Sequence, residues 1–406
     1  MPERAHDNAP WPDPLGEAAY HGLAGEWLCL ISPHTEADPA ALLWHFLPAV
    51  GNMIGRGPHF RAEGDRHYPV LYTVIVGQTS KGRKGTAEGR VKQLLNLVDP
   101  DWAKNRIKSG LSTGEGLVYE VRDAIGGKKP VPSVSDKRLL VSEPEFARVF
   151  SACERPGSTL SPTIRQAWDC PELLSPMTKT SRCQATRPHI SITGHITRDE
   201  LMRKLSETEE FNGFANRILW GCVRRSQCLP EGGLDVDLTD VASRISVAVN
   251  AAKGVGEMKR SNAARVLWND VYPGLSEGKP GLLGAVTARA EAQVMRIACI
   301  YALLDEEAEI KKVHLSAALA VWGYNVASCQ WIFGDALGDP IADEILRELK
   351  SNPAGLTRTE IRDHFGRNKR ADQIGRALNV LAEYGLARYF KQPTEGRPAE
   401  LWKCTG

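Results

Sequence analysis

A glycine- and lysine-rich stretch at positions 77–86, GQTSKGRKGT, contains the residue types that bind phosphate groups. Glycines let backbone N–H groups turn toward phosphate oxygens, a lysine neutralises the β- and γ-phosphates, and a hydroxyl group coordinates Mg²⁺. The stretch therefore predicts a site for ATP with Mg²⁺. Its candidate cofactor-binding residues are Gly77, Thr79, Ser80, Lys81, Gly82, Arg83, Lys84, Gly85 and Thr86.

The spacing of this loop departs from the usual pattern G-x-x-x-x-G-K-[ST]. Counted from Gly77, that pattern places Arg83 where the lysine belongs. Lys84 follows one residue later, and a glycine separates it from Thr86. We assign Lys84 to the phosphates and Thr86 to the metal ion, with Lys81 as the rival lysine. The alternative is a basic surface loop that binds nothing.

Carboxylates in two segments could serve the metal ion or the attacking water. In RLLVSEPE, at positions 138–145, Glu143 ends an apolar strand and Glu145 follows two residues later. Either could hold Mg²⁺ while the other polarises water; a solvated acidic strand end is the alternative. Glu115, in GLSTGEGL at positions 110–117, is a candidate general base. A helix N-cap loop would explain this second segment equally well.

Two further segments offer groups for the γ-phosphate. His195 and Thr193 lie near the end of an apolar strand, in SITGHIT, and could sense that phosphate. A structural histidine is equally consistent with the pattern. Arg217, in FNGFANR, is the first candidate for an arginine that stabilises the developing charge, often from a neighbouring subunit. Arg225 is the second candidate, and a structural ion pair is the alternative.

The elements that must position these residues alternate between strands and helices. The β-branched run at 70–76 predicts a strand buried on both faces of a parallel sheet, and a helix should follow the loop through Val98. Further strands are expected at 138–142, 189–193 and 217–223. The pattern predicts an α/β fold, with helical additions before and after it.

The last 65 or so residues predict a winged helix-turn-helix, with three helices and a two-stranded wing. Thr357 and Glu360 form a capping box for the second helix. Basic residues on these elements could neutralise DNA phosphates. An alternative is a winged helix that binds protein. The basic residues on the helices and their turn are Arg358, Arg362, Arg367, Lys369, Arg370 and Arg376, and those on the wing are Arg388, Lys391 and Arg397.

Composition limits the classes of protein to consider. The 406 residues suffice for two domains and a third small one. No apolar run reaches the roughly 18 residues of a membrane span, so we expect no membrane partner. The nine cysteines include no C-x-x-C pair, which favours a reducing cytoplasm. Because the net charge is only +2, affinity for nucleic acid must come from local basic patches.

The predicted organisation has five parts. Residues 1–15 are expected to be a disordered lead, 16–68 an N-terminal helical segment, and 69–235 the P-loop ATPase core. A helical region at 236–338 and the winged helix-turn-helix at 340–406 complete it.

From about Ala19 to Trp402 the chain resembles the uncharacterised RecA-like P-loop ATPases of plasmids, phages and integrated elements. These proteins are described as helicase-like or RepA-like and are often associated with primase-polymerase domains. The resemblance rests on HTEADPAALL, GRGPHF, GDRHYP, GQTSKGRKGT, SGLSTGEGL, RQAWD, ISITGHIT, NGFANR, RAEAQVMRIACIYALLD and GRPAELW.

The resemblance implies a RecA-like core that binds ATP and Mg²⁺, assembles as a homo-oligomer such as a hexamer, and acts in replication of mobile DNA. A primase would then be a separate partner. Two hypotheses follow. The chain is either an Mg-ATP-dependent motor acting on single-stranded DNA or an origin duplex, or a nucleotide-switched DNA-binding initiator or regulator with weak hydrolysis.

Overall fold

The computed structural model describes residues 10–78, 82–127, 129–176, 183–205, 213–278, 281–334, 337, 339–392 and 399–405. The chain divides into two compact units. Met1–Gly278 and Val286–Ile332 form the first, and Lys279–Ala285 and Phe333–Gly406 form the second.

A five-stranded parallel sheet forms the centre of the first unit, in the order β4-β5-β8-β3-β9. The predicted α/β character is therefore confirmed, and the four predicted strands all belong to this sheet. The two-residue strand β4 was not predicted because it is too short to show a pattern. The strands are β3 (Tyr72–Val76), β4 (Ile107–Lys108), β5 (Arg138–Glu143), β8 (His189–Ile196) and β9 (Ile218–Cys222).

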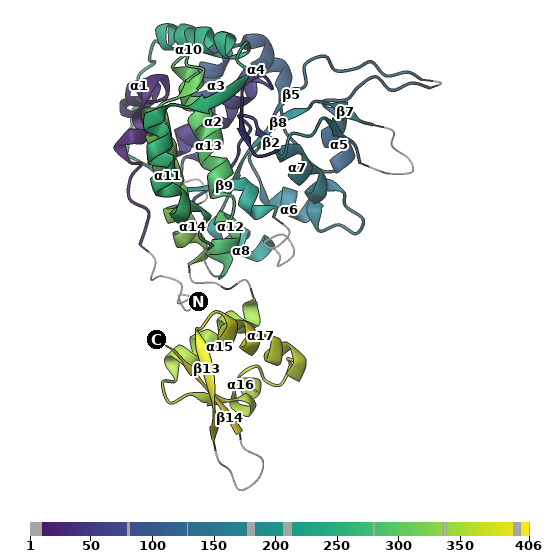
Figure 1. The fold of residues 1–406 in the computed structure, drawn as a ribbon, viewed down its shortest axis with the longest axis vertical. Helices are drawn as coiled ribbons and strands as arrows, with labels where there is room; N and C mark the ends of the chain where they lie inside the picture. Colours follow the sequence, from purple (N-terminus) through teal and green to yellow (C-terminus); the bar gives the residue numbers. More distant parts are fainter. Residues whose placement is uncertain are drawn as a thin grey trace. The chain divides into compact units, whose positions relative to one another are not determined.

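Helices cover both faces of this sheet. Successive side chains of a strand point to opposite faces, and β3 shows it. The Tyr72 hydroxyl donates to the Ile164 carbonyl of α7 (Leu160–Trp168), whereas the Thr73 hydroxyl donates to the Trp44 carbonyl of α2 (Pro39–Ile54). Figure 1 shows α2 and α3 (Lys84–Val98) on one side of the sheet and α5 (Gly114–Tyr119) and α7 on the other. This double burial explains the continuous apolar run of β3.

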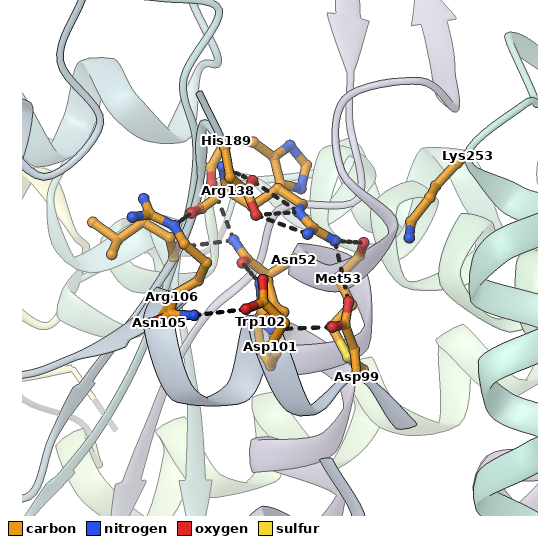
Figure 2. Close-up of polar contacts among 12 residues, drawn as sticks. Asn52, Met53, Asp99, Asp101, Trp102, Asn105, Arg106, Arg138, His189 and Lys253 are labelled. Carbon is orange, nitrogen blue, oxygen red and sulfur yellow. Dashed lines mark hydrogen bonds and ion pairs between the residues drawn. The ribbon is translucent and has the colours of Figure 1, made fainter. Parts of the chain in front are cut away.

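The amino ends of β5 and β8 are fixed to α2 by the buried side chain of Asn52 (Figure 2). Its amide donates to the carbonyls of Leu139 and His189 at 2.9 and 3.0 Å. Its carbonyl accepts the Trp102 indole N–H, at 3.1 Å, from α4 (Pro100–Arg106). The helix, two strands and α4 are thereby held together through one side chain.

The helical segments before and after the sheet share its hydrophobic core. Buried residues of α1 (Gly22–Ile31), α10 (Thr239–Ala252), α13 (Ala290–Leu304) and α14 (Lys312–Phe333) form one cluster with α2, α3 and the sheet. The segment at 55–67 contains the antiparallel strands β1 (His59–Ala62) and β2 (Asp65–His67).

The remaining elements of the first unit are short or peripheral. A second sheet has the order β11-β10-β1-β2, and β6 pairs with β7. Among the helices that the structure describes, none has both the length and the apolar character that crossing a membrane requires. The bounds not yet given are α6 (Ala147–Cys153), β6 (Leu173–Leu174), β7 (Ala185–Thr186), α8 (Arg198–Lys204), β10 (Glu257–Arg260), α11 (Asn262–Ser276), α12 (Gly281–Thr287, partly in the second unit) and β11 (Glu309–Ile310).

The second unit has three main helices and a small antiparallel sheet of order β12-β14-β13. Its core includes Leu349, Ile361, Leu378 and Trp402. The expected capping box is present, since Thr357 and Glu360 bond reciprocally. The predicted turn of the wing, with Arg397, lies outside the described residues. The elements are α15 (Pro340–Ser351), β12 (Leu356–Thr357), α16 (Arg358–His364), α17 (Ala371–Glu383), β13 (Ala387–Gln392) and β14 (Ala399–Cys404).

Candidate functional site

The neighbouring strands β3 and β8 are followed by connections that run to opposite sides of the sheet. The connection after β3 crosses over β8 and β5 to reach β4, whereas the connection that leads from β8 to β9 crosses over β3. In open α/β sheets ligands bind outside the carboxyl ends of the strands at such a switch point. The topology therefore directs attention to the ends of β3 and β8.

A cavity of about 580 Å³ lies at this edge. Its walls come from the first residue of α3, the β5–α6 connection, α6, the end of β8 and the start of α8. The lining carries three cations and two carboxylates. Its residues are Lys84, Pro144, Glu145, Ala147, Arg148, Ser151, Arg155, His195, Ile196, Thr197 and Glu200.

Lys84 joins this cavity to the predicted phosphate loop. Its ammonium group donates to the carbonyls of Gly77 and Ile196, at 2.7 and 3.0 Å, across the ends of β3 and β8. Burial lowers the pKa of Lys84 to about 8, and the nearby carboxylate of Glu200 opposes that shift. Gly77 is required here because a Cβ would lie 2.7 Å from the Val223 carbonyl oxygen. Lys84 thus lies at the strand ends with a pKa below its ordinary value.

The loop leads into α3 through a residue with left-handed backbone. Arg83 has φ 49° and its guanidinium pairs with Glu36 at 2.6 Å, so it turns to the outer side of the loop. Gly85 and Thr86 are exposed in the first turn of α3, where free N–H groups favour an anion. Gly82 is buried, with its amide donating to the Gln78 carbonyl at 3.4 Å. Thr79, Ser80 and Lys81 lie outside the described residues.

The two carboxylates that end β5 differ in their surroundings. Glu145 is exposed and lines the cavity. Glu143 is only 5% exposed and accepts the Leu111 amide at 2.6 Å. Burial raises the pKa of Glu143, while hydrogen bonds from the Leu111 and Gly110 amides oppose the rise. Glu143 is not among the cavity-lining residues, so of these two carboxylates Glu145 is the one that lines the same cavity as Lys84.

Glu115 lies in the first turn of α5, as expected of a capping segment. Its carboxylate accepts the Thr159 hydroxyl at 3.0 Å, and the Thr113 side chain caps the helix through the Gly116 amide. Glu115 does not line the cavity. The helix-cap alternative for this segment matches these contacts.

His195 lines the cavity and is 6% exposed. Burial lowers the pKa of its imidazole to about 4, with a smaller opposing contribution from Glu88. The ring is therefore neutral near pH 7. Its Nε2 lies 2.8 Å from Nε2 of His45, a residue of α2 that the sequence analysis did not select.

Arg217 lies at the opposite edge of the sheet from the cavity, in a structural ion pair of the kind given above as the alternative. It immediately precedes β9, at the amino ends of the parallel strands. At about 3.3 Å per residue, the five residues of β9 separate it from the carboxyl edge by roughly 16 Å. Its guanidinium pairs with Asp169 at 2.9 Å and donates to the Gly213 carbonyl at 2.7 Å. The motif supplies an arginine, but the edge of the sheet at which this arginine lies is set by its position just before β9.

Arg225, the second candidate, does lie beyond the carboxyl end of β9. Its guanidinium is 3.7 Å from Glu36, the carboxylate that also pairs with Arg83. Glu36 thus links the loop before α3 to the segment after β9. Arg225 does not line the cavity.

Two arginines that the sequence analysis missed line the cavity instead. Arg148 lies in the first turns of α6 and Arg155 just beyond that helix, and both are exposed. Within the described part of the chain, neither guanidinium has a hydrogen-bond or ion-pair partner. A basic residue shortly after a strand-ending carboxylate was the available signal for Arg148. Thr197 and Glu200 were also readable as a capping box, which the structure contains.

The candidate DNA-binding residues all belong to the second unit. A cavity of about 300 Å³ is lined by Arg358, Arg362 and Arg367. The other four lining residues belong to α16 and α17. Arg367 pairs with Asp363 at 2.7 Å, whereas Arg376 lies 3.8 Å from Asp372. Lys369 and Arg370 are in the connection between α16 and α17.

A scan against models of known protein families finds no match to this chain, and a search of curated proteins finds none. The functional argument therefore rests on the residues and on the site itself.

Proposed function

We propose that this protein binds ATP at the carboxyl edge of the parallel sheet and hydrolyses it, with a RecA-like P-loop core. The observation that carries the proposal is the position of Lys84. Its ammonium group bridges the ends of β3 and β8, at the first turn of a 15-residue helix and in the wall of a cavity. A glycine-rich loop joins the same strand to the same helix, which is the arrangement that P-loops use.

The charges in the cavity support an anionic ligand. Lys84 would exchange its two carbonyl partners for phosphate oxygens, and the unpaired guanidinium of Arg148 offers a planar pair of donors for the same group. Arg148 replaces Arg217 as our candidate for stabilising charge on the γ-phosphate within one chain. Arg217 remains a candidate only toward a neighbouring subunit, where its partner Asp169 would compete.

Mg²⁺ would shield the phosphate charge and orient the γ-phosphate for attack by water. The donors present fit this role in part. Thr86 has an exposed hydroxyl at the start of α3, whereas Glu143 already accepts the Leu111 amide. We therefore propose Thr86 as one ligand and Glu143 or Glu145 as the carboxylate. Glu145 is the better candidate for contact with water because it faces the cavity.

The second unit supports a role on DNA. Three helices, an antiparallel hairpin and arginines around one cavity are the features of a winged helix-turn-helix with a basic surface. Combined with the resemblance described above, this favours an oligomeric, helicase-like motor in the replication of a mobile element. A separate primase is the partner that this role would require.

One experiment tests both parts of the proposal. Steady-state ATP turnover is measured with and without single-stranded and duplex DNA, on the wild-type chain and on Lys84→Ala, together with the oligomeric mass in solution. We expect Mg²⁺-dependent turnover that DNA stimulates and that Lys84→Ala abolishes. If neither kind of DNA changes the turnover, the proposed motor function is wrong. If the protein does not bind ATP, the proposed nucleotide site is wrong.

The shifted spacing of the phosphate loop keeps a second candidate function open. A nucleotide-bound core with weak hydrolysis could act as a switch, with the second unit recognising an origin or operator. Sequence-specific DNA binding that survives in Lys84→Ala, together with retained plasmid or phage replication, favours this regulator over the motor.

A further inference from the structure

A chain of three polar side chains runs from the interior of the first unit to the cavity. The Thr193 hydroxyl lies 2.9 Å from Nδ1 of His45, and Nε2 of His45 lies 2.8 Å from Nε2 of His195. The three residues are 2, 3 and 6% exposed, respectively. They come from two different elements, β8 and α2, which pack against each other. The contact between the two imidazoles is therefore built by tertiary packing.

The chain ends at His195, a residue that lines the cavity, and its Nδ1 is not among the buried side-chain atoms that lack a partner. Because Nε2 of His195 is engaged with His45, the remaining ring nitrogen is Nδ1. No described residue forms a hydrogen bond with this Nδ1, although His195 lines the cavity. A ring nitrogen without a partner at the edge of a cavity is open to a ligand.

Both imidazoles are neutral, which makes their protons interdependent. Burial lowers the pKa of His45 to about 3 and that of His195 to about 4. A neutral imidazole has one N–H donor and one acceptor nitrogen. In the hydrogen bond between them, one Nε2 must donate and the other must accept. The proton position on one ring therefore fixes the proton position on the other.

Only two arrangements satisfy the whole chain. In the first, the Thr193 hydroxyl donates to His45 Nδ1, His45 Nε2–H donates to His195 Nε2, and His195 presents Nδ1–H to the cavity. In the second, all three protons are reversed, and His195 presents a bare Nδ1. An anionic phosphate oxygen can accept a hydrogen bond but cannot donate one, so it selects the first arrangement.

We propose that His45 is a positioning residue that, with Thr193, holds His195 as a neutral Nδ1–H donor to the terminal phosphate of the nucleotide. This inference rests on the proposed function and deepens it by assigning the discrimination between nucleoside triphosphate and diphosphate. The ligand of His195 is the γ-phosphate, which ADP lacks. The lysine at the loop serves both nucleotides.

The surroundings argue against a purely structural explanation of the chain. A pair of apolar side chains of similar size would pack between α2 and β8 without the desolvation cost of two imidazoles. Nearby charge is already balanced, because Glu88 accepts the Ser142 hydroxyl and pairs with Lys92, both at 2.6 Å. Glu88 therefore has ion-pair and hydrogen-bond partners of its own and acts on the two histidines only through its charge, and the residue at the end of the chain, His195, lines the cavity.

The test compares affinities for a non-hydrolysable ATP analogue and for ADP, by calorimetry, in full-length protein. His45→Phe removes the donor to His195, and Thr193→Val removes the hydroxyl while nearly keeping the shape. We expect His45→Phe to lower the affinity for the analogue about tenfold relative to ADP, the size of one hydrogen bond to a charged group. Thr193→Val should lower it less, because a hydroxyl can donate or accept and fits both proton arrangements. Thr193→Ser, which keeps the hydroxyl, should preserve the wild-type ratio. Thermal unfolding identifies any variant that fails to fold.

A spectroscopic readout gives the direct check. Nitrogen-15 NMR of the imidazoles should report Nδ1–H for His195 in the complex with the ATP analogue, and a weaker preference for it in His45→Phe. If the wild type binds the analogue but His195 carries its proton on Nε2, or if His45→Phe keeps the wild-type affinity ratio, the positioning role is wrong and the nucleotide site stands. If the wild type binds neither nucleotide, both proposals fall together.

Discussion

The ammonium nitrogen of Lys84 lies 2.7 Å from the carbonyl oxygen of Gly77 and thus occupies the end of the strand that precedes its own loop. Partial burial removes water from the ammonium group, which is why the pKa of Lys84 falls from 10.5 to about 8 even though the Glu200 carboxylate opposes the shift. The partly buried ammonium group of Lys84 consequently lowers the stability of the folded protein, and an anion bound beside it would offset that loss.

This cost predicts that Lys84→Met stabilises the ligand-free protein. The pKa is lower in the folded than in the unfolded chain, so the unfolded chain binds more protons between about pH 8 and 10.5. The penalty is full below pH 8 and disappears as the pH rises through that window. After allowance for solvent screening at this partly exposed group, we expect a gain of about 1 kcal/mol at pH 7 in chemical denaturation, vanishing above pH 10.

Lys104→Met is the matched control, because Lys104 is exposed in α4. It should change the free energy of unfolding by less than about 0.5 kcal/mol at any pH. A loss of stability in Lys84→Met at pH 7 would contradict the interpretation of Lys84 as a strained, ligand-binding cation.

Arg148→Ala should lower ATP turnover while leaving the fold intact. Arg148 is exposed, lines the cavity and forms no hydrogen bond or ion pair among the described residues, and its charge acts only weakly on Glu143, so we expect a change in stability within about 0.5 kcal/mol. An arginine on the γ-phosphate contributes roughly 10³-fold or more to turnover. The measurement is steady-state ATP hydrolysis beside thermal unfolding. Arg122→Ala, a substitution at an arginine whose guanidinium stacks on Tyr119 instead, provides the comparison. Equal turnover in Arg148→Ala and the wild type would exclude this assignment.

Arg217→Ala should lower the stability of the fold, in contrast to Arg148→Ala. The Arg217 guanidinium is 8% exposed and pairs with Asp169, so its removal leaves the Gly213 carbonyl without its donor and leaves Asp169 with only the more distant Arg289, at 4.0 Å. We expect a loss of about 1–3 kcal/mol in the free energy of unfolding, because Asp169 is itself half exposed and can turn to water. A double-mutant cycle with Asp169→Ala isolates the pair. If oligomeric protein loses turnover in Arg217→Ala without losing stability, the arginine acts on a neighbouring subunit instead.

The contrast between Arg148 and Arg217 shows which features of the site can be predicted from the sequence. Local patterns identified four of the five central strands, the capping box at Thr357 and the loop that leads to Lys84, because each depends on neighbours in the chain. They did not place Arg217, since the edge that it occupies follows from its position just before β9 and from the parallel direction of β9 beside β3, which the sheet pairing shows.

His45 was equally hidden from a reading of the sequence. It lies about 150 residues from His195, and its role follows from the packing of α2 on the sheet. In its own helix it has no periodicity or neighbour that distinguishes it from a core residue. Chemistry that depends on strand order and on contacts distant in sequence is therefore recovered from the structure alone.

Asn52→Ala should destabilise the first unit severely. Its fully buried amide satisfies two backbone carbonyls, at Leu139 and His189, and accepts the Trp102 indole (Figure 2). Alanine leaves these three groups without partners, so we expect a loss of about 2–4 kcal/mol in the free energy of unfolding. Asn105→Ala is the control: its amide donates only to Asp101, on the exposed side of α4. Comparable stability of the two variants would show that the buried network contributes little.

Arg362→Ala should weaken binding to DNA without regard to sequence. Arg362 lines the cavity of the second unit and, in the part of the chain described, has no ion-pair partner, so its charge is available to a phosphate. Loss of one phosphate contact should reduce the slope of log K against log salt by about 0.9. The measurement is fluorescence anisotropy of full-length protein on labelled duplex DNA over a range of salt concentrations. Arg347→Ala is the matched control, because Arg347 of α15 already pairs with Glu344 at 2.7 Å and should leave the slope unchanged. If both variants keep the wild-type slope and affinity, the second unit binds DNA elsewhere or binds protein, which was the alternative for this module.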